Sequence, residues 1–104
     1  MTMLKIGDHA PEVELSDQNS DFFKLSALLG KGPVVVYFYP KDDTPVCTKE
    51  ACTFRDRHAE FTGLDAVIVG ISDDDVASHK RFATAHRLPF TLLSDVDGKA
   101  REAF

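Results

Sequence analysis

The stretch that decides the fold is residues 33–52, which read PVVVYFYPKDDTPVCTKEAC. Its first part, Val34 to Tyr39, consists of β-branched and aromatic residues without alternation between apolar and polar positions. This pattern predicts a strand that is buried on both faces of a sheet. Pro40 ends the predicted strand, and residues 41–43 form a loop. The segment therefore begins inside a sheet and leaves it at a proline.

A helix follows the loop and is expected to extend from Pro45 to about Thr62. Thr44 suits the N-cap, and Pro45 suits the first helical position. Gly63 suits the C-terminal end. The side chains expected to form an apolar stripe on this helix are Val46, Ala51, Phe54, His58 and Phe61. The helix is therefore expected to pack against the sheet along that stripe.

The rest of the chain alternates between predicted strands and helices. Short strands are expected at residues 12–16, 22–25, 66–71 and 88–93, with a helical turn at 26–29 and a helix from a cap at 73–75 to about 86. The first two strands would form an N-terminal β-hairpin. This order indicates an α/β fold, with a central sheet of parallel strands and helices on both faces. With 104 residues the chain is expected to form a single domain, residues 1–104.

Charge and composition restrict the partners and the location. The formal net charge is -5, which argues against nucleic acid or an anionic membrane as a partner. No apolar stretch approaches the roughly 20 residues needed to cross a bilayer, and residues 1–10 lack the pattern of a secretory signal. The expected location is therefore cytoplasmic. In that reducing compartment, a cysteine pair such as Cys47 and Cys52 is more often catalytic or metal-binding than structural.

Cys47 is the third residue of the predicted helix and lies on its first turn. The first N–H groups of a helix have no intrahelical acceptor, and that end of the helix carries partial positive charge. A thiolate in this position is stabilised relative to a thiol, and the thiolate is the reactive form of cysteine. Position alone leaves two interpretations open, a reactive nucleophile or a small buried apolar residue.

Cys52 lies five residues after Cys47. On a regular helix this spacing turns the two side chains about 140° apart and separates the two Cα atoms by roughly 8–9 Å. A disulfide needs a Cα separation of about 4.4–6.8 Å, so pairing would require the first turns of the helix to unwind. Oxidation of such a pair would then drive a local conformational change. The alternative is that Cys52 is a core residue of the helix.

Metal binding receives little support from the sequence. Zinc needs about four ligands, and the histidines show no suitable grouping with the cysteines. We therefore expect all four histidines to lie at the surface or to be half-buried, namely His9, His58, His79 and His86. Residues 73–75 are expected to form a helix-capping acidic turn and not a cation site.

Residues 37–52 resemble the active-site segment of the peroxiredoxins, in particular that of the peroxiredoxin Q group, also called bacterioferritin-comigratory proteins. The general pattern Pro-x-x-x-Thr-x-x-Cys is met by Pro40, Thr44 and Cys47, and a second cysteine five residues later is characteristic of that group. Further matches follow at residues 54–56, 69–72, 78–79 and 88–95. The resemblance covers nearly the whole chain and implies a thioredoxin-like fold and the reduction of hydrogen peroxide and organic hydroperoxides.

The same resemblance implies roles for individual residues. Cys47 would be the peroxidatic cysteine, which is oxidised to a sulfenic acid. Thr44 would hydrogen-bond the peroxide and the thiolate, and Pro40 would shield the site from bulk water. Cys52 would condense with the sulfenic acid to an intramolecular disulfide, which thioredoxin or a similar thiol donor would reduce. No metal or organic cofactor is implied, and the neighbouring Asp42 receives no definite role.

The sequence departs from the family pattern at two places. Val46 stands where the group usually has Gly, and its β-branched side chain is expected to narrow peroxide access or to slow unwinding. The chain also ends at Phe104, before the part of the family's chain that carries its active-site arginine. No residue here is matched to that arginine.

The second departure predicts a C-terminally truncated product or fragment. The strand at Val34 to Tyr39 would then lie at a sheet edge with unpaired backbone groups. Such a chain would be a monomer of marginal stability or would cover that edge by self-association. Two functions stay open, a peroxiredoxin Q-type thiol peroxidase and a weakly active or inactive thioredoxin-like remnant that lacks the arginine.

Overall fold

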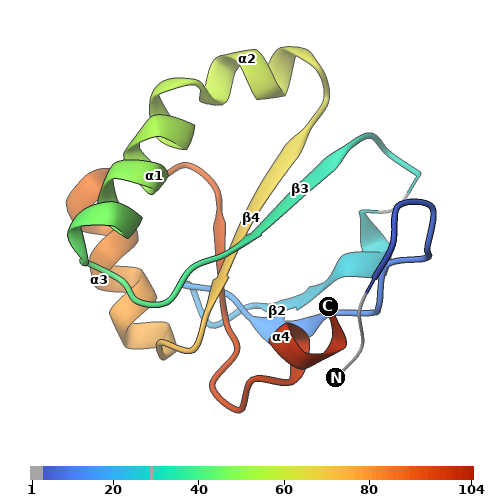
Figure 1. The fold of residues 1–104 in the computed structure, drawn as a ribbon. Helices are drawn as coiled ribbons and strands as arrows, with labels where there is room; N and C mark the ends of the chain where they lie inside the picture. Colours follow the sequence, from blue (N-terminus) through green and yellow to red (C-terminus); the bar gives the residue numbers. More distant parts are fainter. Residues whose placement is uncertain (1–3, 29) are drawn as a thin grey trace.

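The computed structural model describes residues 4–28 and 30–104, and Figure 1 shows their arrangement. The centre is a three-stranded parallel sheet in the order β3-β4-β5. The strand bounds are Val34–Phe38 for β3, Val67–Ser72 for β4 and Thr91–Ser94 for β5. In the register of the sheet, Val36 lies beside Val69, and Val69 lies beside Thr91. Such β-branched side chains favour the extended backbone of a sheet.

Three helices lie together on one side of this sheet (Figure 1). They are α1 (Pro45–Asp56) and α2 (His58–Gly63), which connect β3 to β4, and α3 (Val76–His86), which connects β4 to β5. Two crossovers of the same hand that advance along a sheet in one direction place their helices on the same face. As a result α1 contacts α3, and Arg55 Nη1 donates to the carbonyl oxygen of His86 at 2.8 Å. In the described ranges, none of the helices has the length and apolar character needed to cross a membrane.

The predicted helix from Pro45 to Thr62 is divided in two by Arg57, which has φ −104° and ψ 10°. The predicted apolar stripe is also wrong at Val46, whose side chain is 78% exposed. Residues four apart share a face of a helix, so Cys47 lies above Ala51 and takes the inward position on the first turn. Val46 is turned away from that face and points to solvent.

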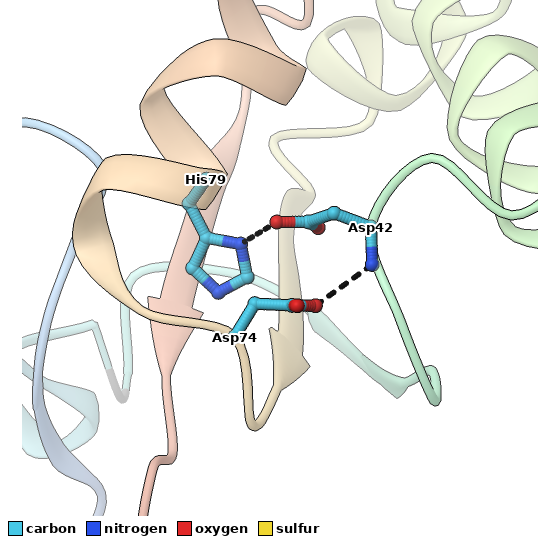
Figure 2. A group of neighbouring side chains, drawn as sticks. All are labelled: Asp42, Asp74 and His79. Atoms are coloured by element: carbon cyan, nitrogen blue, oxygen red, sulfur yellow. Dashed lines mark hydrogen bonds and ion pairs between the residues drawn. The ribbon is translucent and has the colours of Figure 1, made fainter.

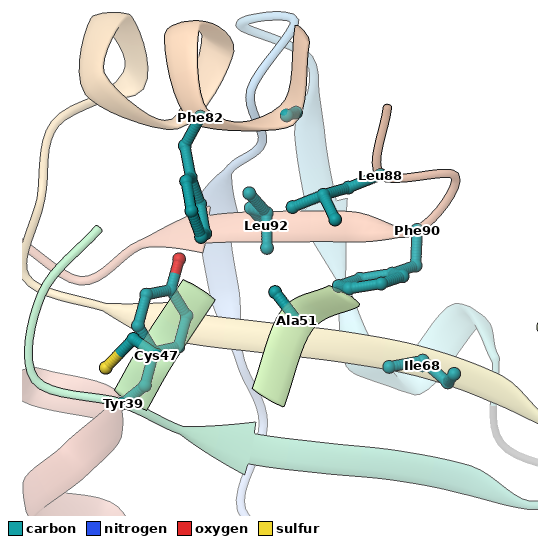
Figure 3. Close-up of a cluster of buried hydrophobic side chains, with 9 residues drawn as sticks. Tyr39, Cys47, Ala51, Ile68, Phe82, Leu88, Phe90 and Leu92 are labelled. Atoms are coloured by element: carbon teal, nitrogen blue, oxygen red, sulfur yellow. The ribbon is translucent and has the colours of Figure 1, made fainter. Parts of the chain in front are cut away.

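Hydrophobic cores lie on both faces of the sheet. Successive side chains of β4 alternate, so Ile68 enters one core and Val69 enters the other. On the face covered by the helices, the core contains Tyr39, Cys47, Ala51, Ile68, Phe82, Ala83, Leu88, Phe90 and Leu92 (Figure 3). The opposite core contains Val13, Leu25, Val69, Ile71, Leu93 and Ala100. Cys47 is therefore part of the core between α1, α3 and the sheet.

The second face of the sheet is covered by the N-terminal and C-terminal elements. An antiparallel hairpin consists of β1 (Glu14–Ser16) and β2 (Phe22–Lys24), and it is followed by the 3₁₀ helix η1 (Leu25–Ala27). The short helix α4 (Lys99–Ala103) packs beside it. The predicted turn at 26–29 corresponds to η1, and Leu29 lies outside the described residues. The α/β class, with helices on both faces and an N-terminal hairpin, is confirmed.

Strand β3 lies at the edge of the sheet, because in the described residues it pairs with β4 only. This agrees with the edge position expected from the sequence, whereas the prediction that the strand is buried on both faces is wrong. Its first four residues are half-buried, and Phe38 is 37% exposed. An edge strand has a neighbouring strand on one side only, which leaves its side chains less covered. Phe38 is covered on one side by Phe104, with 5.5 Å between the ring centroids.

Candidate active site

The start of α1 places Cys47 on the first helical turn, as predicted. Thr44 precedes the helix with an extended backbone, φ −80° and ψ 150°, and its carbonyl oxygen accepts from Thr48 N at 2.8 Å. The Thr44 hydroxyl does not cap the helix and instead donates to the carbonyl oxygen of Lys41 at 3.0 Å. The first amides of α1 therefore have no acceptor in the Thr44 side chain, and this helix end can face an anion.

A pocket of about 410 Å³ lies beside this helix start. Pro40, Thr44 and Cys47 contribute to its lining, together with Tyr39 and Val46. Cys47 is 5% exposed, and Figure 3 shows it at the edge of the core beside the ring of Tyr39. The two interpretations of Cys47 are thus compatible, because the side chain is buried and still borders a pocket. The structure brings three of the four predicted site residues together.

The fourth predicted residue, Cys52, lies elsewhere on α1. Both cysteines are free thiols, Cys47 buried and Cys52 half-buried. They belong to the same continuous helix, so helix geometry sets their Cα atoms roughly 8–9 Å apart. The Cys52 Sγ lies 3.9 Å from Nδ1 of His86 on α3. Pairing of the two cysteines would therefore require α1 to unwind near its start.

Asp42, to which the sequence analysis gave no role, is the centre of a buried hydrogen-bond network (Figure 2). Its backbone N–H donates to Asp74 Oδ2 at 2.7 Å. Its carboxylate accepts hydrogen bonds from three side chains, at 2.6 Å from Tyr39 Oη, 2.8 Å from Ser78 Oγ and 2.7 Å from His79 Nδ1. The network joins the loop after β3 to the loop after β4 and to α3. It therefore fixes the loop that leads into α1.

The hydrogen bonds of His79 define its protonation. Nε2 lies 3.0 Å from the carbonyl oxygen of Leu93, which can only accept, so Nε2 carries a proton. Nδ1 faces the Asp42 carboxylate, and we assign a second proton to it because Asp42 also accepts from two hydroxyl groups. Burial raises the pKa of Asp42, but the hydrogen bonds from His79, Tyr39 and Ser78 outweigh it and hold the pKa below its ordinary value. The Asp42 carboxylate is therefore the shared acceptor at the centre of the network.

The expectation that all histidines lie at the surface or are half-buried is wrong for His79, which is fully buried. The carboxyl ends of neighbouring parallel strands meet at one edge of a sheet, which brings Asp42 and Asp74 together. The acidic turn does cap α3, because Asp75 accepts from Ser78 N at 2.8 Å. Asp74 is instead buried and holds Asp42. The position of both aspartates just after predicted strands was the signal that could have revealed the network.

Asp42, Asp74 and His79 place three potential metal ligands within 4.8 Å of one another. Their hydrogen bonds already account for this arrangement, since Asp74 Oδ2 also accepts from Ser72 Oγ at 2.8 Å. A cation would have to replace the proton on His79 and break these bonds. We therefore interpret the group as a network that positions the loop.

The fold and the site together define a class of protein. The chain is a thioredoxin-like α/β protein whose first core helix presents a cysteine on its first turn. The sequence profile of the AhpC/TSA family matches residues 6–104, and the chain belongs to this family. Among solved structures, peroxidoxin BcpB of Mycobacterium tuberculosis is 46% identical with a TM-score of 0.94, over 98% of this chain and 66% of that one. The thioredoxin-like peroxiredoxin fold is confirmed.

Curated relatives belong to the peroxiredoxin Q group, which confirms the resemblance found in the sequence. The chloroplastic peroxiredoxin Q of Populus jackii is 54% identical over 96 residues, which are 92% of this chain and 45% of that protein. Peroxiredoxin Bcp of Bacillus subtilis is 50% identical over 101 residues, 97% of this chain and 64% of that protein. The chain therefore spans less than two thirds of the length of either relative.

Proposed function

We propose that this chain is a thiol-dependent peroxidase that reduces hydrogen peroxide and organic hydroperoxides through Cys47. The observation that carries the proposal is the position of Cys47, on the first turn of α1 and in the lining of a pocket with Thr44 and Pro40. Membership of the AhpC/TSA family supports it. A small pocket at a helix N-terminus suits a peroxide, whose O–O bond is cleaved by a thiolate.

In the proposed reaction the Cys47 thiolate attacks one peroxide oxygen and forms an S–O bond while the O–O bond breaks. Cys47 is oxidised to a sulfenic acid, and the departing oxygen takes up a proton and leaves as water or an alcohol. The free amides of the first turn are donors that stabilise the developing negative charge, and the Thr44 hydroxyl joins them when it turns away from the carbonyl oxygen of Lys41. Pro40 lines the same pocket and limits the access of water.

Cys52 then acts as the resolving cysteine. After α1 unwinds near its start, the Cys52 sulfur attacks the sulfenic acid, a disulfide forms and water leaves. We propose thioredoxin or a similar dithiol as the reductant, and the cytoplasm as the location. A single domain over residues 1–104, either monomeric or associated through the edge of β3, is part of the same proposal.

A second candidate is a weakly active or inactive remnant of the same fold. The observation that favours it is the lining of the pocket, which contains no arginine from the described ranges 4–28 and 30–104. A peroxide and a thiolate would then lack a fixed cation beside them, which lowers the stabilisation of the transition state. Val46, exposed at the rim of the pocket, is a further difference from the family pattern.

Rapid mixing with hydrogen peroxide distinguishes the two candidates. We expect sulfenic acid at Cys47 to form at least about 100-fold faster than on free cysteine, because fixed donors contribute about that much. Cys47→Ser is expected to abolish the reaction, and Cys52→Ser to retain sulfenic acid formation but to form no intramolecular disulfide. Both steps are followed by trapping with dimedone and mass spectrometry. Reaction of Cys47 no faster than free cysteine would support the remnant and overturn the peroxidase.

A further inference from the structure

A second aspartate–histidine pair lies against Cys52, away from the Cys47 pocket. His86, the last residue of α3, has its Nδ1 3.9 Å from Cys52 Sγ. Its other nitrogen, Nε2, lies 3.2 Å from Oδ1 of Asp43, in the loop before α1. The three residues therefore form a row of carboxylate, imidazole and thiol. None of them took part in the motif pattern shared by Pro40, Thr44 and Cys47.

The order of these contacts defines what the imidazole can do. The Asp43 carboxylate only accepts hydrogen bonds, so it selects the tautomer with a proton on Nε2 of His86. Nδ1 then carries a lone pair, and this lone pair faces the Cys52 thiol. A carboxylate that orients an imidazole toward a nucleophile is a recurring arrangement for general-base catalysis.

The groups around His86 favour this role. It ends α3, and the C-terminal end of a helix stabilises positive charge. Its ring packs edge-on against Phe82, with centroids 5.2 Å apart, which holds its orientation. The guanidinium of Arg55 does not bind the His86 ring. Its Nη1 donates to the backbone carbonyl oxygen of His86, and its Nη2 lies 3.0 Å from Asp56 Oδ1. Asp43 is the carboxylate that faces the ring.

We propose that His86 is the general base that activates Cys52 and that Asp43 is its positioning residue. This rests on the proposed resolving role of Cys52. Nδ1 takes the proton from the Cys52 thiol, the resulting thiolate attacks the Cys47 sulfenic acid, and the sulfur–sulfur bond forms as the S–O bond breaks. The departing hydroxide takes up a proton and leaves as water, so that one cysteine sulfur is oxidised and the other is reduced.

The proton transfer belongs to the folded state of α1, before its first turns unwind. There the thiol and the imidazole are already within reach, and such contacts shorten further in a reacting complex. Cys52 then leaves the helix as a thiolate and needs no base at its new position. The thiolate is the reactive form of cysteine, and an imidazole that accepts the thiol proton supplies it.

The first experiment measures Cys52 alone. In a Cys47→Ser chain, alkylation of Cys52 by iodoacetamide is followed between pH 6 and pH 9. We expect Cys52 to be alkylated at an appreciable rate already at neutral pH. His86→Gln is expected to slow alkylation at pH 7 about tenfold, so that the alkylation rate rises only at alkaline pH. Asp43→Asn, which keeps a residue tolerant of the positive φ of 60°, is expected to give an intermediate profile.

His9→Gln is the matched control, because His9 lies exposed in the N-terminal segment. An alkylation rate and pH profile of Cys52 that are the same with and without His86 would overturn the proposal. Because this experiment involves no peroxide, its result does not depend on whether Cys47 is a peroxidatic cysteine.

The second experiment uses the chain with both cysteines and one equivalent of hydrogen peroxide. We expect His86→Gln to prolong the lifetime of the Cys47 sulfenic acid about tenfold, as measured by dimedone trapping at successive times. The rate of sulfenic acid formation is read from the same samples. A sulfenic acid that decays equally fast in His86→Gln and His9→Gln would overturn the role of His86, and absence of sulfenic acid in every variant would overturn the proposed function instead.

Discussion

Two aspartate–histidine pairs join the same loop to the same helix, and they differ in burial. Asp42 and Asp43 are neighbours before α1, and His79 and His86 lie seven residues apart on α3. Seven residues make nearly two full turns, so both rings extend from the same face of α3. The side chains of His79 and Asp42 are 0% and 3% exposed, whereas those of His86 and Asp43 are 28% and 64% exposed.

The two pairs also differ in what the second ring nitrogen contacts. In His79 it donates to the carbonyl oxygen of Leu93, so the ring has no capacity left for a reaction. In His86 it faces the sulfur of Cys52. The same combination of an aspartate and a histidine therefore serves two different purposes in this molecule. The buried pair holds the loop that carries Thr44 into α1, and the exposed pair is placed to accept a proton.

Asp42→Ala is expected to have the largest effect. It leaves His79 buried without its partner and removes the acceptor of two hydroxyl groups, which costs about 3–5 kcal/mol of unfolding free energy. Asp43→Asn is the matched variant one residue away, because Asn tolerates the positive φ of 60° at this position. It removes a carboxylate that is mostly in solvent, so we expect a loss of about 0–1 kcal/mol. Urea unfolding followed by circular dichroism measures both.

Similar losses for the two variants would contradict the distinction between a buried and an exposed pair. If Asp42→Ala does not fold, Asp42→Asn provides the measurement, because the amide keeps the shape of the side chain. Its oxygen can accept from some of the three donors, so its loss should lie between those of Asp42→Ala and Asp43→Asn.

Tyr39→Phe is expected to have a smaller effect on the buried pair. It removes the hydroxyl that donates to Asp42 at 2.6 Å and keeps the aromatic ring in the core, at a cost of about 1–3 kcal/mol. Tyr37→Phe is the control, because the hydroxyl of Tyr37 is buried without a hydrogen-bond partner in the described part of the chain. We expect that control to be neutral or stabilising. If both variants lost the same free energy of unfolding in urea, the Tyr39 hydrogen bond would contribute nothing to stability.

These pairs show which parts of the molecule can be predicted from sequence. The strand, loop and helix of residues 33–52 depend on local signals, such as Pro40 and Pro45 at the element ends, and the structure confirms their order. The break at Arg57 has no such signal, because neither Pro nor Gly marks it. Burial of β3 was overestimated, because its apolar run is typical of a strand with neighbours on both sides, and its edge position was expected only from the family resemblance.

The site shows the same limit. Cys47 and Thr44 are close in sequence, so a motif can place them. Asp42 and His79 are separated by 37 residues, and Cys52 and His86 by 34. Their contacts depend on the order of the parallel strands and on the face where α1 and α3 lie together. A single sequence gives no direct evidence of either, which explains why both aspartate–histidine pairs were missed.

The smallest predicted effect concerns the proton of the buried pair. The pKa of Asp42 lies below its ordinary value of 3.8 in the folded chain, since the hydrogen bonds from His79, Tyr39 and Ser78 outweigh the effect of burial. The unfolded chain therefore takes up a proton first as the pH falls. The stabilisation is complete above the pKa that Asp42 has in the unfolded chain, and it is lost as the pH falls through the pKa that Asp42 has in the folded chain. Between pH 6 and pH 3.5 this costs only about 0.5 kcal/mol.

Carbon NMR of the Asp42 carboxyl group measures this effect directly, with a short peptide of the loop sequence as the unfolded reference. We expect the folded resonance to remain that of a carboxylate at pH 3.8, where the peptide is half protonated. A folded midpoint above that of the peptide would show that burial outweighs the hydrogen bonds from His79, Tyr39 and Ser78. The carboxylate would then not be stabilised by its partners, and the large loss expected for Asp42→Ala would have lost its main physical reason.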